Sequence, residues 1–322
     1  MTRLRTGVAW AAVAGMATTA VLPWLKPGGG KVAAMTRSLM PWSGLTAVPV
    51  AVEAAIRGRR PLAAASGVVG AAAVVMVAPL VVPRRQPAAD PDAAPLRVTH
   101  ANLLYVNRRV AAVPGALQPL GADVLTFSEL TPTHCRRLHG TSLSAAYPHQ
   151  IELSTSFASG AGLWSRWPLT SHPSTSTNHR TIVADVHAPG GTVRVIAIHT
   201  VSPMHGYRRW CEDLERLAEI TTPGPALMTG DFNASWWHPE LRRLIRSGGW
   251  RDAHQVLGRG LSCSWPTDRW HPVFKVHPPF VRLDHTLVND GLRVLDAANF
   301  DVPGSDHLGI AVTVQRARPA TP

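Results

Sequence analysis

The chain contains almost no lysine. Its 322 residues include only Lys26, Lys31 and Lys275, and arginine supplies the rest of the basic charge behind a formal net charge of +12. That charge suggests nucleic-acid binding, but no run of basic residues is interleaved with aromatic ones. Residues 1–95 hold ten Arg and Lys residues against three Asp and Glu residues. Much of the charge therefore flanks apolar runs, and charge alone does not argue for binding of double-stranded DNA.

Metal-binding patterns built on cysteine and histidine are also missing. The three cysteines, Cys135, Cys211 and Cys263, form no CxxC pair, and the 15 histidines include no HExxH or similar spacing. These absences disfavour a zinc module and a zinc hydrolase. We expect the cysteines to be small buried apolar residues, and one disulfide with one remaining thiol is the alternative.

The first 85 residues contain three apolar runs. Residues 7–25 and 62–82 carry no charge and are long enough to span a bilayer, whereas 39–56 is interrupted by two prolines and a glutamate. A cleavable signal peptide is the alternative for the first run. The later runs favour a membrane region of two or three transmembrane helices over residues 1–85. A linker rich in Pro, Ala and Asp follows at residues 86–95.

The number of spans fixes the side of the membrane on which the remainder lies. With three spans, Arg3 and Arg5 share the cytoplasmic side with the basic cluster at residues 57–60, in line with the positive-inside tendency. With two spans, that cluster would face outward. We therefore expect a multi-pass protein of the cell membrane with three spans and an extracytoplasmic domain.

Residues 96–322 are typical of one α/β domain in which polar side chains follow buried apolar runs. The apolar pattern predicts strands at 96–104, 123–127, 160–169, 181–186, 192–198, 225–228, 281–288 and 308–314, and helices at 108–120, 207–220 and 239–247. Asn102, Glu129 and His199 each stand near or just beyond the end of a predicted strand.

The stretch Gly230-Asp231-Phe232-Asn233 organises this domain. Gly230 ends an apolar strand and lets the backbone come close to a ligand. Asp231 and Asn233 are two residues apart and face one side of an extended chain. A carboxylate that orients water beside a carboxamide that donates hydrogen bonds suits hydrolysis, although a plain turn is the alternative for this short motif.

Further residues extend this set. Glu129 has no basic neighbour in sequence, and such a carboxylate beside a buried strand is costly unless it is solvated or binds a cation such as Mg²⁺. His307 follows Asp306, and Asp284 on a neighbouring strand would fix the tautomer of this imidazole and raise its basicity. His199 would donate to developing charge.

The order of these motifs resembles the endonuclease/exonuclease/phosphatase superfamily, which includes DNase I-like nucleases, inositol polyphosphate phosphatases and sphingomyelinases. The resemblance covers roughly residues 96–316. It implies a four-layer α/β sandwich of two packed mixed sheets with the site at their carboxyl-end rim, preceded here by the transmembrane helices. It also implies Mg²⁺-dependent hydrolysis of phosphoesters, with Mn²⁺ as an alternative ion.

By this resemblance, Glu129 is the metal-ligand glutamate, Asn102 lies beside the metal and phosphate, and Asp306 is the adjacent metal-side aspartate. Some nucleases of the superfamily carry an Asp two residues after the first Asn. The corresponding residue here is Leu104, which disfavours the abasic-site nuclease branch.

The resemblance also assigns the catalytic residues. Asp231 and Asn233 correspond to the pair that orients water and binds the phosphoryl oxygens. His307 corresponds to the imidazole at the scissile phosphate, with Asp284 as its partner carboxylate. His199 corresponds to the second histidine of DNase I-like members. Asp231 and the Asp284–His307 pair are both candidates for the general base.

The layout of the whole chain resembles a membrane-anchored actinobacterial branch of the superfamily, the VanJ-type proteins. A short linker would keep the site near lipid phosphates, so we hypothesise a lipid-linked polyprenyl phosphate or pyrophosphate as the substrate and membrane lipids as partners. The alternative is a membrane-tethered extracellular endonuclease or exonuclease. It would depend on the basic helix around Arg242, Arg243 and Arg246 and lose affinity with salt. No protein partner is inferred.

Overall fold

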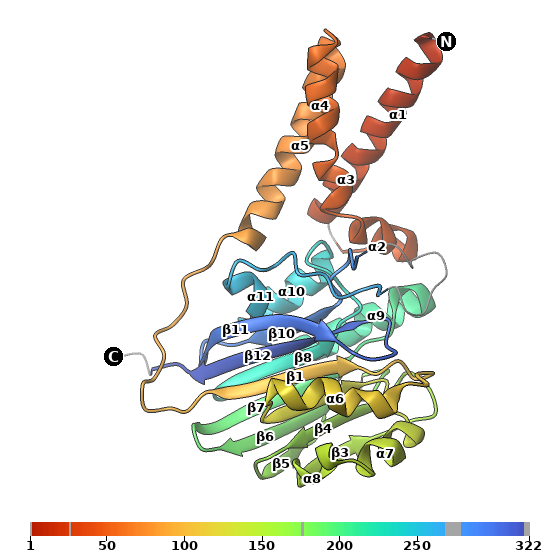
Figure 1. Cartoon of the computed structure of the whole chain (residues 1–322). Helices are drawn as coiled ribbons and strands as arrows, with labels where there is room; N and C mark the ends of the chain where they lie inside the picture. Colours follow the sequence, from red (N-terminus) through yellow and green to blue (C-terminus); the bar gives the residue numbers. More distant parts are fainter. Residues whose placement is uncertain (1, 26, 175–176, 268–277, 319–322) are drawn as a thin grey trace.

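The computed structural model describes residues 2–25, 27–174, 177–267 and 278–318 (Figure 1). Lys26, Lys275 and the end of the predicted domain at 319–322 lie outside the described residues. From residue 96 onward the chain forms two six-stranded sheets that pack face to face with helices outside them, which is the predicted four-layer α/β sandwich. The fold class expected from the sequence is therefore confirmed.

The strands of the two sheets are arranged alike. The first sheet has the order β11 (Leu292–Asp301), β12 (Leu308–Arg316), β1 (Leu96–Asn102), β2 (Val124–Ser128), β4 (Ala161–Ser165) and β3 (His149–Leu153). The second has the order β5 (Leu169–His172), β6 (Ile182–Ala188), β7 (Gly191–His199), β8 (Ala226–Asp231), β10 (Asp284–Val288) and β9 (Arg251–Asp252). One neighbouring pair in each sheet is parallel, β1 with β2 and β7 with β8, and all other pairs are antiparallel.

The core lies in three apolar layers. Side chains such as Val98, Leu163, Val195, Leu227 and Val312 fill the space between the sheets. The second sheet is covered outside by α9 (Pro203–Ala218) and α10 (Pro239–Ser247), and the first by α6 (Val113–Leu117) and α7 (Pro132–His139). The shorter helices of the domain are η2 (Val110–Ala112), η3 (Gln118–Leu120), α8 (Ser142–Ala145) and α11 (Ala253–Val256).

The structure corrects several details of the predicted elements. The helix predicted at 108–120 is divided into η2, α6 and η3, because proline stands at the first or second position of both α6 and η3. The strand predicted at 281–288 begins only at Asp284, so Arg282 precedes it. Strands β3, β5, β9 and β11 were not predicted. All three cysteines are partly buried free thiols, so the alternative with a disulfide is wrong.

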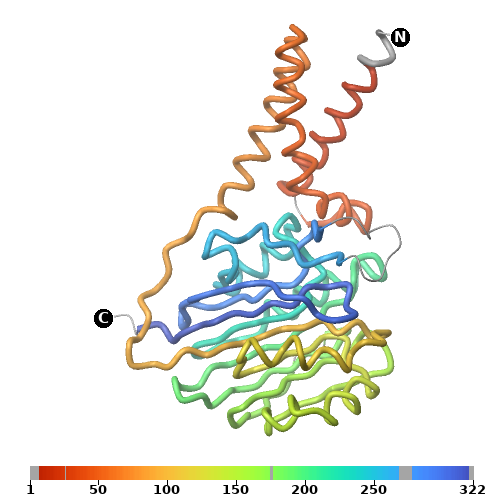
Figure 2. Tube along the Cα trace, in the orientation of Figure 1, coloured from red at the N-terminus to blue at the C-terminus, as the bar shows by residue number. Residues whose placement is uncertain are grey.

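Helices α1 (Thr2–Val21), α4 (Ala47–Ile56) and α5 (Arg60–Val81) project from one side of the α/β sandwich (Figures 1 and 2). The described residues contain two helices long and apolar enough to cross a membrane, or three if α2 (Gly30–Ser38) and the bent continuation through α3 (Trp42–Leu45) and α4 count as one. The start of α1 and the turn between α4 and α5 both lie at the end away from the sandwich. The basic residues of both segments thus lie away from the sandwich.

The segment at residues 86–95 lies along the first sheet and is attached to it by hydrogen bonds. Gln86 exchanges two hydrogen bonds with the backbone of Val294, at 3.1 and 2.8 Å. The Gln315 side chain donates to the carbonyl oxygens of Asp90 and Ala93. These bonds attach the connection to β11 and β12.

Gly230 tests how tightly the end of β8 is built. Its φ is +153°, and a Cβ there would lie 1.9 Å from the Ile198 carbonyl oxygen of β7. We expect Gly230→Ala to lower the free energy of unfolding by more than about 1 kcal/mol, because the alanine Cβ would clash with the backbone of β7. Gly224→Ala is the matched control, since nothing lies within 4 Å of its Cβ position. Chemical denaturation of both variants measures this, and equal stabilities would contradict the close approach.

Candidate active site

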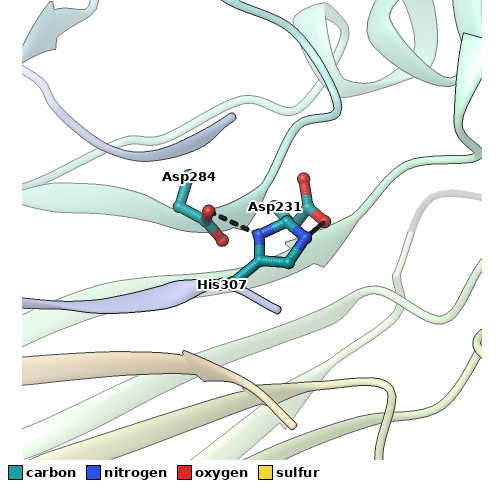
Figure 3. A group of neighbouring side chains, drawn as sticks. All are labelled: Asp231, Asp284 and His307. Carbon is teal, nitrogen blue, oxygen red and sulfur yellow. Dashed lines mark hydrogen bonds and ion pairs between the residues drawn. The ribbon is translucent and has the colours of Figure 1, made fainter. Parts of the chain in front are cut away.

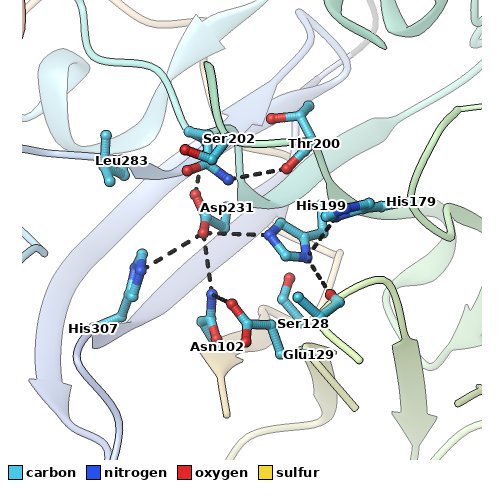
Figure 4. Close-up of polar contacts among 12 residues, drawn as sticks. Asn102, Ser128, Glu129, His179, His199, Thr200, Ser202, Asp231, Leu283 and His307 are labelled. Atoms are coloured by element: carbon cyan, nitrogen blue, oxygen red, sulfur yellow. Dashed lines mark hydrogen bonds and ion pairs between the residues drawn. The ribbon is translucent and has the colours of Figure 1, made fainter. Parts of the chain in front are cut away.

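The parallel strand pairs bring the predicted residues to one edge of the sandwich. In the second sheet, Asp231 lies opposite His199 of β7 on one side and opposite Asp284 of β10 on the other. In the first sheet, Asn102 ends β1 beside Ser128, and Glu129 follows. Because the carboxyl ends of β1, β2, β7 and β8 meet here, residues separated by up to 205 positions in sequence become neighbours (Figure 4).

Asn102 joins the two sheets at the site. Its Nδ2 donates to Glu129 Oε1 at 3.2 Å and to Asp231 Oδ2 at 3.1 Å. Its Oδ1 accepts from the Leu104 backbone at 3.0 Å. Asn102 thus holds one carboxylate from each sheet, and its placement beside a metal ion stays a prediction.

Glu129 has a constrained position. Its φ is +59°, which is uncommon outside glycine, and its Oε2 accepts from the Tyr105 backbone at 2.9 Å. Burial raises the pKa of Glu129 above its ordinary value, although the bonds from Tyr105 and Asn102 oppose this. Backbone strain of this kind persists where the surroundings enforce it, and it is common at active sites.

Asp284 and His307 form a buried pair (Figure 3). His307 Nδ1 lies 2.8 Å from Asp284 Oδ2, and His307 Nε2 lies 3.7 Å from Asp231 Oδ2. Although burial opposes the charged imidazole, the carboxylates of Asp284 and Asp231 raise the pKa of His307 well above its ordinary value. Asp284 thus fixes the tautomer of His307 and turns its Nε2–H toward Asp231, while the role of this imidazole at a phosphate stays a prediction.

His199 faces Asp231 from the opposite side. Its Nδ1 lies 3.0 Å from the Ala158 carbonyl oxygen, which can only accept, so this nitrogen carries the proton. Burial lowers the pKa of His199 well below its ordinary value, and nearby imidazoles add to this. The neutral ring then turns an unprotonated Nε2 toward Asp231 Oδ2 at 3.6 Å. His199 is therefore an acceptor here, not the donor that the sequence predicts.

Asn233 and Asp306 complete the predicted set. The Asn233 backbone donates to Asp231 Oδ1 at 2.8 Å, and its Nδ2 donates to the Thr200 carbonyl oxygen at 2.9 Å. One Nδ2 hydrogen remains for a ligand. Asp306 Oδ2 accepts from the Trp265 indole at 3.2 Å, while its buried Oδ1 has no hydrogen-bond partner within the described residues.

Other residues support the site and were not predicted. Ser305 Oγ donates to the Asn102 carbonyl oxygen at 2.7 Å and accepts from the His307 backbone at 3.0 Å. His179 Nδ1 lies 3.2 Å from His199 Nδ1, and His100 Nε2 lies 3.7 Å from Asp284 Oδ1. His100 shares a strand face with Asn102 in the sequence, which was a usable signal. His179 lies outside every predicted strand and gave none.

The carboxylates fit a divalent cation. Burial raises the pKa of Asp231 well above its usual range, and Asp284 and Glu129 add to this effect. Among the described residues, no arginine or lysine forms an ion pair with Asp231, Asp284, Glu129 or Asp306. Oxygen atoms with excess negative charge are the ligands that Mg²⁺ and Mn²⁺ prefer.

One group of potential metal-ligating atoms is found among the described residues. Atoms of Asp231, Asp284 and His307 lie within 4.8 Å of one another. That closeness reflects the His307–Asp284 hydrogen bond, which uses both partners. Glu129 lies nearby and accepts only from the neutral Asn102 and Tyr105 donors, and Asp306 Oδ1 has no hydrogen-bond partner within the described residues.

Comparison with known proteins identifies the family. Residues 99–307 match the endonuclease/exonuclease/phosphatase family. The chain belongs to this family. Its members are metal-dependent hydrolases that act as nucleases, phosphatases or phosphodiesterases. No curated protein matched the chain.

Solved structures share the fold at low sequence identity. A zebrafish (D. rerio) TDP2 complexed with a single-strand DNA product is 18% identical with a TM-score of 0.58, covering 69% of this chain and 99% of that one. An endonuclease/exonuclease/phosphatase protein from Beutenbergia cavernae is 19% identical with a TM-score of 0.52, covering 69% and 72%. SmcL is 14% identical with a TM-score of 0.53, covering 69% and 99%.

The Asp284–His307 pair generates a prediction for activity. Asp284→Asn removes the negative charge that orients His307 and keeps its imidazole protonated. We therefore expect turnover of bis(p-nitrophenyl) phosphate with Mg²⁺ or Mn²⁺ to fall about 100-fold or more. The exposed Asp92 supplies the control, Asp92→Asn, which should keep full activity. Full activity in Asp284→Asn would show that the pair has no part in the reaction.

A second buried charge cluster lies behind the site. Asp252 accepts from Arg282 at 2.8 Å and lies 2.7 Å from His285 Nδ1, and His285 Nε2 lies 2.9 Å from the Ala234 carbonyl oxygen next to Asn233. Although burial opposes ionisation, Arg282 and His285 hold the pKa of Asp252 well below its ordinary value. The cluster thus braces the loop that follows Asn233.

Stability should depend on pH through Asp252. The pKa of Asp252 is lower in the folded state than in the unfolded state, where it is about 3.9. Ionised Asp252 therefore stabilises the fold fully above that pH, and this stabilisation is lost as the pH falls from there toward the folded-state pKa. We expect Asp252→Asn to cost about 3–5 kcal/mol at neutral pH, since Arg282 stays buried without a counter-charge, and less near pH 3. Denaturant unfolding at both pH values measures this. Asp290→Asn, at an 84% exposed side chain, should change stability by less than about 1 kcal/mol.

Proposed function

We propose that this family member is a membrane-anchored hydrolase of lipid-linked phosphate or pyrophosphate, such as a polyprenyl carrier. The observation that carries the proposal is the contact between the projecting helices and the loop that follows Asn233, which we call the active-site loop. Trp237 lies four residues beyond Asn233 and is buried among Met40, Met76 and Leu80 at the base of those helices. If the helices span a bilayer, the site stays close to lipid phosphates.

The arrangement of the basic residues supports an extracytoplasmic domain. Helix α1 begins at Thr2, and its start and the turn at residues 57–59 both lie at the end away from the sandwich. With three spans, both basic segments then share the cytoplasmic side and the hydrolase domain faces outward. This layout also supports placement in the VanJ-type branch.

The residues of the site have separate tasks in hydrolysis. Glu129 and Asp306 would hold the Mg²⁺ or Mn²⁺, which supplies charge stabilisation on the non-bridging phosphate oxygens. Asp231, held by Asn102 and the Asn233 backbone, orients the attacking water. The Nε2–H of His307 and the free Nδ2 hydrogen of Asn233 donate to phosphoryl oxygens as negative charge develops. His199 accepts a hydrogen bond from water at the same position.

A membrane-tethered nuclease is the second candidate. The bound single-strand DNA product in the zebrafish TDP2 structure favours it by analogy. The basic helix α10 gives it less support than the sequence suggested. Arg242 donates to the carbonyl oxygens of Trp236 and Pro23, and Arg243 lies 3.8 Å from Glu215. Arg243 and Arg246 are both exposed, but only Arg243 forms an ion pair among the described residues. Arg246 is therefore the one arginine of α10 that is both exposed and outside any such pair.

Substrate choice is tested with the full chain purified in detergent. We expect Mg²⁺-dependent phosphate release from a polyprenyl pyrophosphate, abolished by EDTA and lowered at least about 100-fold in Glu129→Gln, since the variant loses a charged metal ligand. Glu215→Gln, at a 62% exposed side chain, is the matched control and should retain activity.

Plasmid nicking under the same conditions separates the two candidates. Phosphate release with intact plasmid supports the lipid phosphohydrolase. Nicking without phosphate release assigns the site to a nuclease. A folded protein that does neither contradicts both substrate proposals and leaves the family membership unaffected.

A further inference from the structure

Helix α2 differs from the helices that project from the domain. It has only nine residues, and it meets the segment that continues into α4 at an angle of 57°. Figures 1 and 2 show it between the base of the projecting helices and the sandwich, beside α9. It therefore has one face toward the catalytic domain and one face away from it.

The inner face of α2 is bonded to the loop that follows Asn233. His238 Nδ1 accepts from the Ser235 backbone at 2.9 Å, so its protonated Nε2 donates to the Ala34 carbonyl oxygen at 2.9 Å. Arg37 is 1% exposed and lies 3.4 Å from the buried Glu240. Helix α2 is thus fixed to the segment that directly follows the Gly-Asp-Phe-Asn motif.

The outer face of α2 is apolar and has no protein layer over it among the described residues. Val32, Met35 and Leu39, at i, i+3 and i+7, are 69%, 50% and 47% exposed and form one stripe. In the chain, Trp24 precedes the stripe and Trp42 follows it, and their side chains are 64% and 40% exposed. Clustered large apolar side chains of this kind mark a surface that binds something.

The charges around this stripe indicate which partner fits it. Residues 1–52 contain no Asp or Glu, and the exposed Lys31 stands in the first turn of α2. Apolar residues on one face, a basic residue nearby and flanking tryptophans are typical of helices that lie in the plane of a membrane surface. The long apolar helices α1 and α5 lie on either side of α2 in the chain, so membrane attachment through them would bring a bilayer close to α2.

We propose that α2 lies in the lipid–water interface, with the Val32–Met35–Leu39 stripe against the lipid headgroup layer and the active-site loop bonded to its inner face. The third span is then formed by the segment Trp42–Ile56 alone, and α2 fixes the height of the site above the membrane. This inference rests on the membrane attachment proposed above but not on hydrolysis, and it makes the site suited to phosphates at the headgroup level.

Spin labels in liposomes test this inference. The full chain, with Cys135, Cys211 and Cys263 replaced by serine, is labelled at Met35→Cys and reconstituted in phosphatidylcholine and phosphatidylglycerol vesicles. Val75→Cys on α5 and Arg208→Cys on α9 are controls for lipid and water, since these side chains are 63% and 92% exposed. Accessibility to oxygen and to a water-soluble nickel complex is then compared.

We expect the Met35→Cys label to show a ratio of oxygen to nickel accessibility at least about threefold above that of the Arg208→Cys label and below that of Val75→Cys, because oxygen partitions into lipid. A ratio equal to that of Arg208→Cys, with Val75→Cys in lipid, would overturn the inference and leave membrane attachment intact. A Val75→Cys label in water would overturn the attachment itself. Val32→Cys repeats the measurement if the first variant does not fold.

Discussion

Buried negative charge at the end of β8 is the constraint on which the rest of the site depends. Asp231 and Asp284 are 1% and 0% exposed, and Glu129 and Asp306 lie nearby, while the raised pKa of His307 favours a positive charge beside them. Burying such charge without a partner is costly. The fold meets the cost with hydrogen bonds from Asn102, Asn233 and Tyr105, and the remaining excess suits a divalent cation.

Topology makes this concentration of charge attainable. Each sheet has one parallel pair, and the carboxyl ends of both pairs meet at the same edge, so Asn102 can bond a carboxylate from each sheet. The backbone bears part of the strain, since Leu104, Glu129 and Asn233 all have positive φ. Trp237 packs at the base of the projecting helices, and His238 bonds to α2, so the same loop is joined to the amino-terminal region. The amino-terminal helices and the site therefore share one structural segment.

The sequence carried most of the fold and the membership of the site, because buried strands give continuous apolar runs and the polar residues at their ends interrupt them. The sequence could not predict β11, because only three of its ten residues are buried and several carry polar groups. Nor could it predict the contribution of His179, which reaches the site from a loop. Nor could it give the tautomer of His199 or the bonds made by Asn102, since these depend on Ala158 and Leu104 lying at bonding distance. Spacing in sequence fixes which residues meet, and three-dimensional contacts fix their roles.

Binding of Mn²⁺ tests most directly whether this carboxylate cluster is a metal site. Titration of the purified chain, followed by the electron paramagnetic resonance signal of free Mn²⁺, should give one site that Mg²⁺ displaces. Its affinity should fall at least about tenfold in Glu129→Gln and remain unchanged in Glu215→Gln. Equal Mn²⁺ affinity in Glu129→Gln and in the unaltered chain would contradict the account, because the excess negative charge would then be balanced without a cation at Glu129.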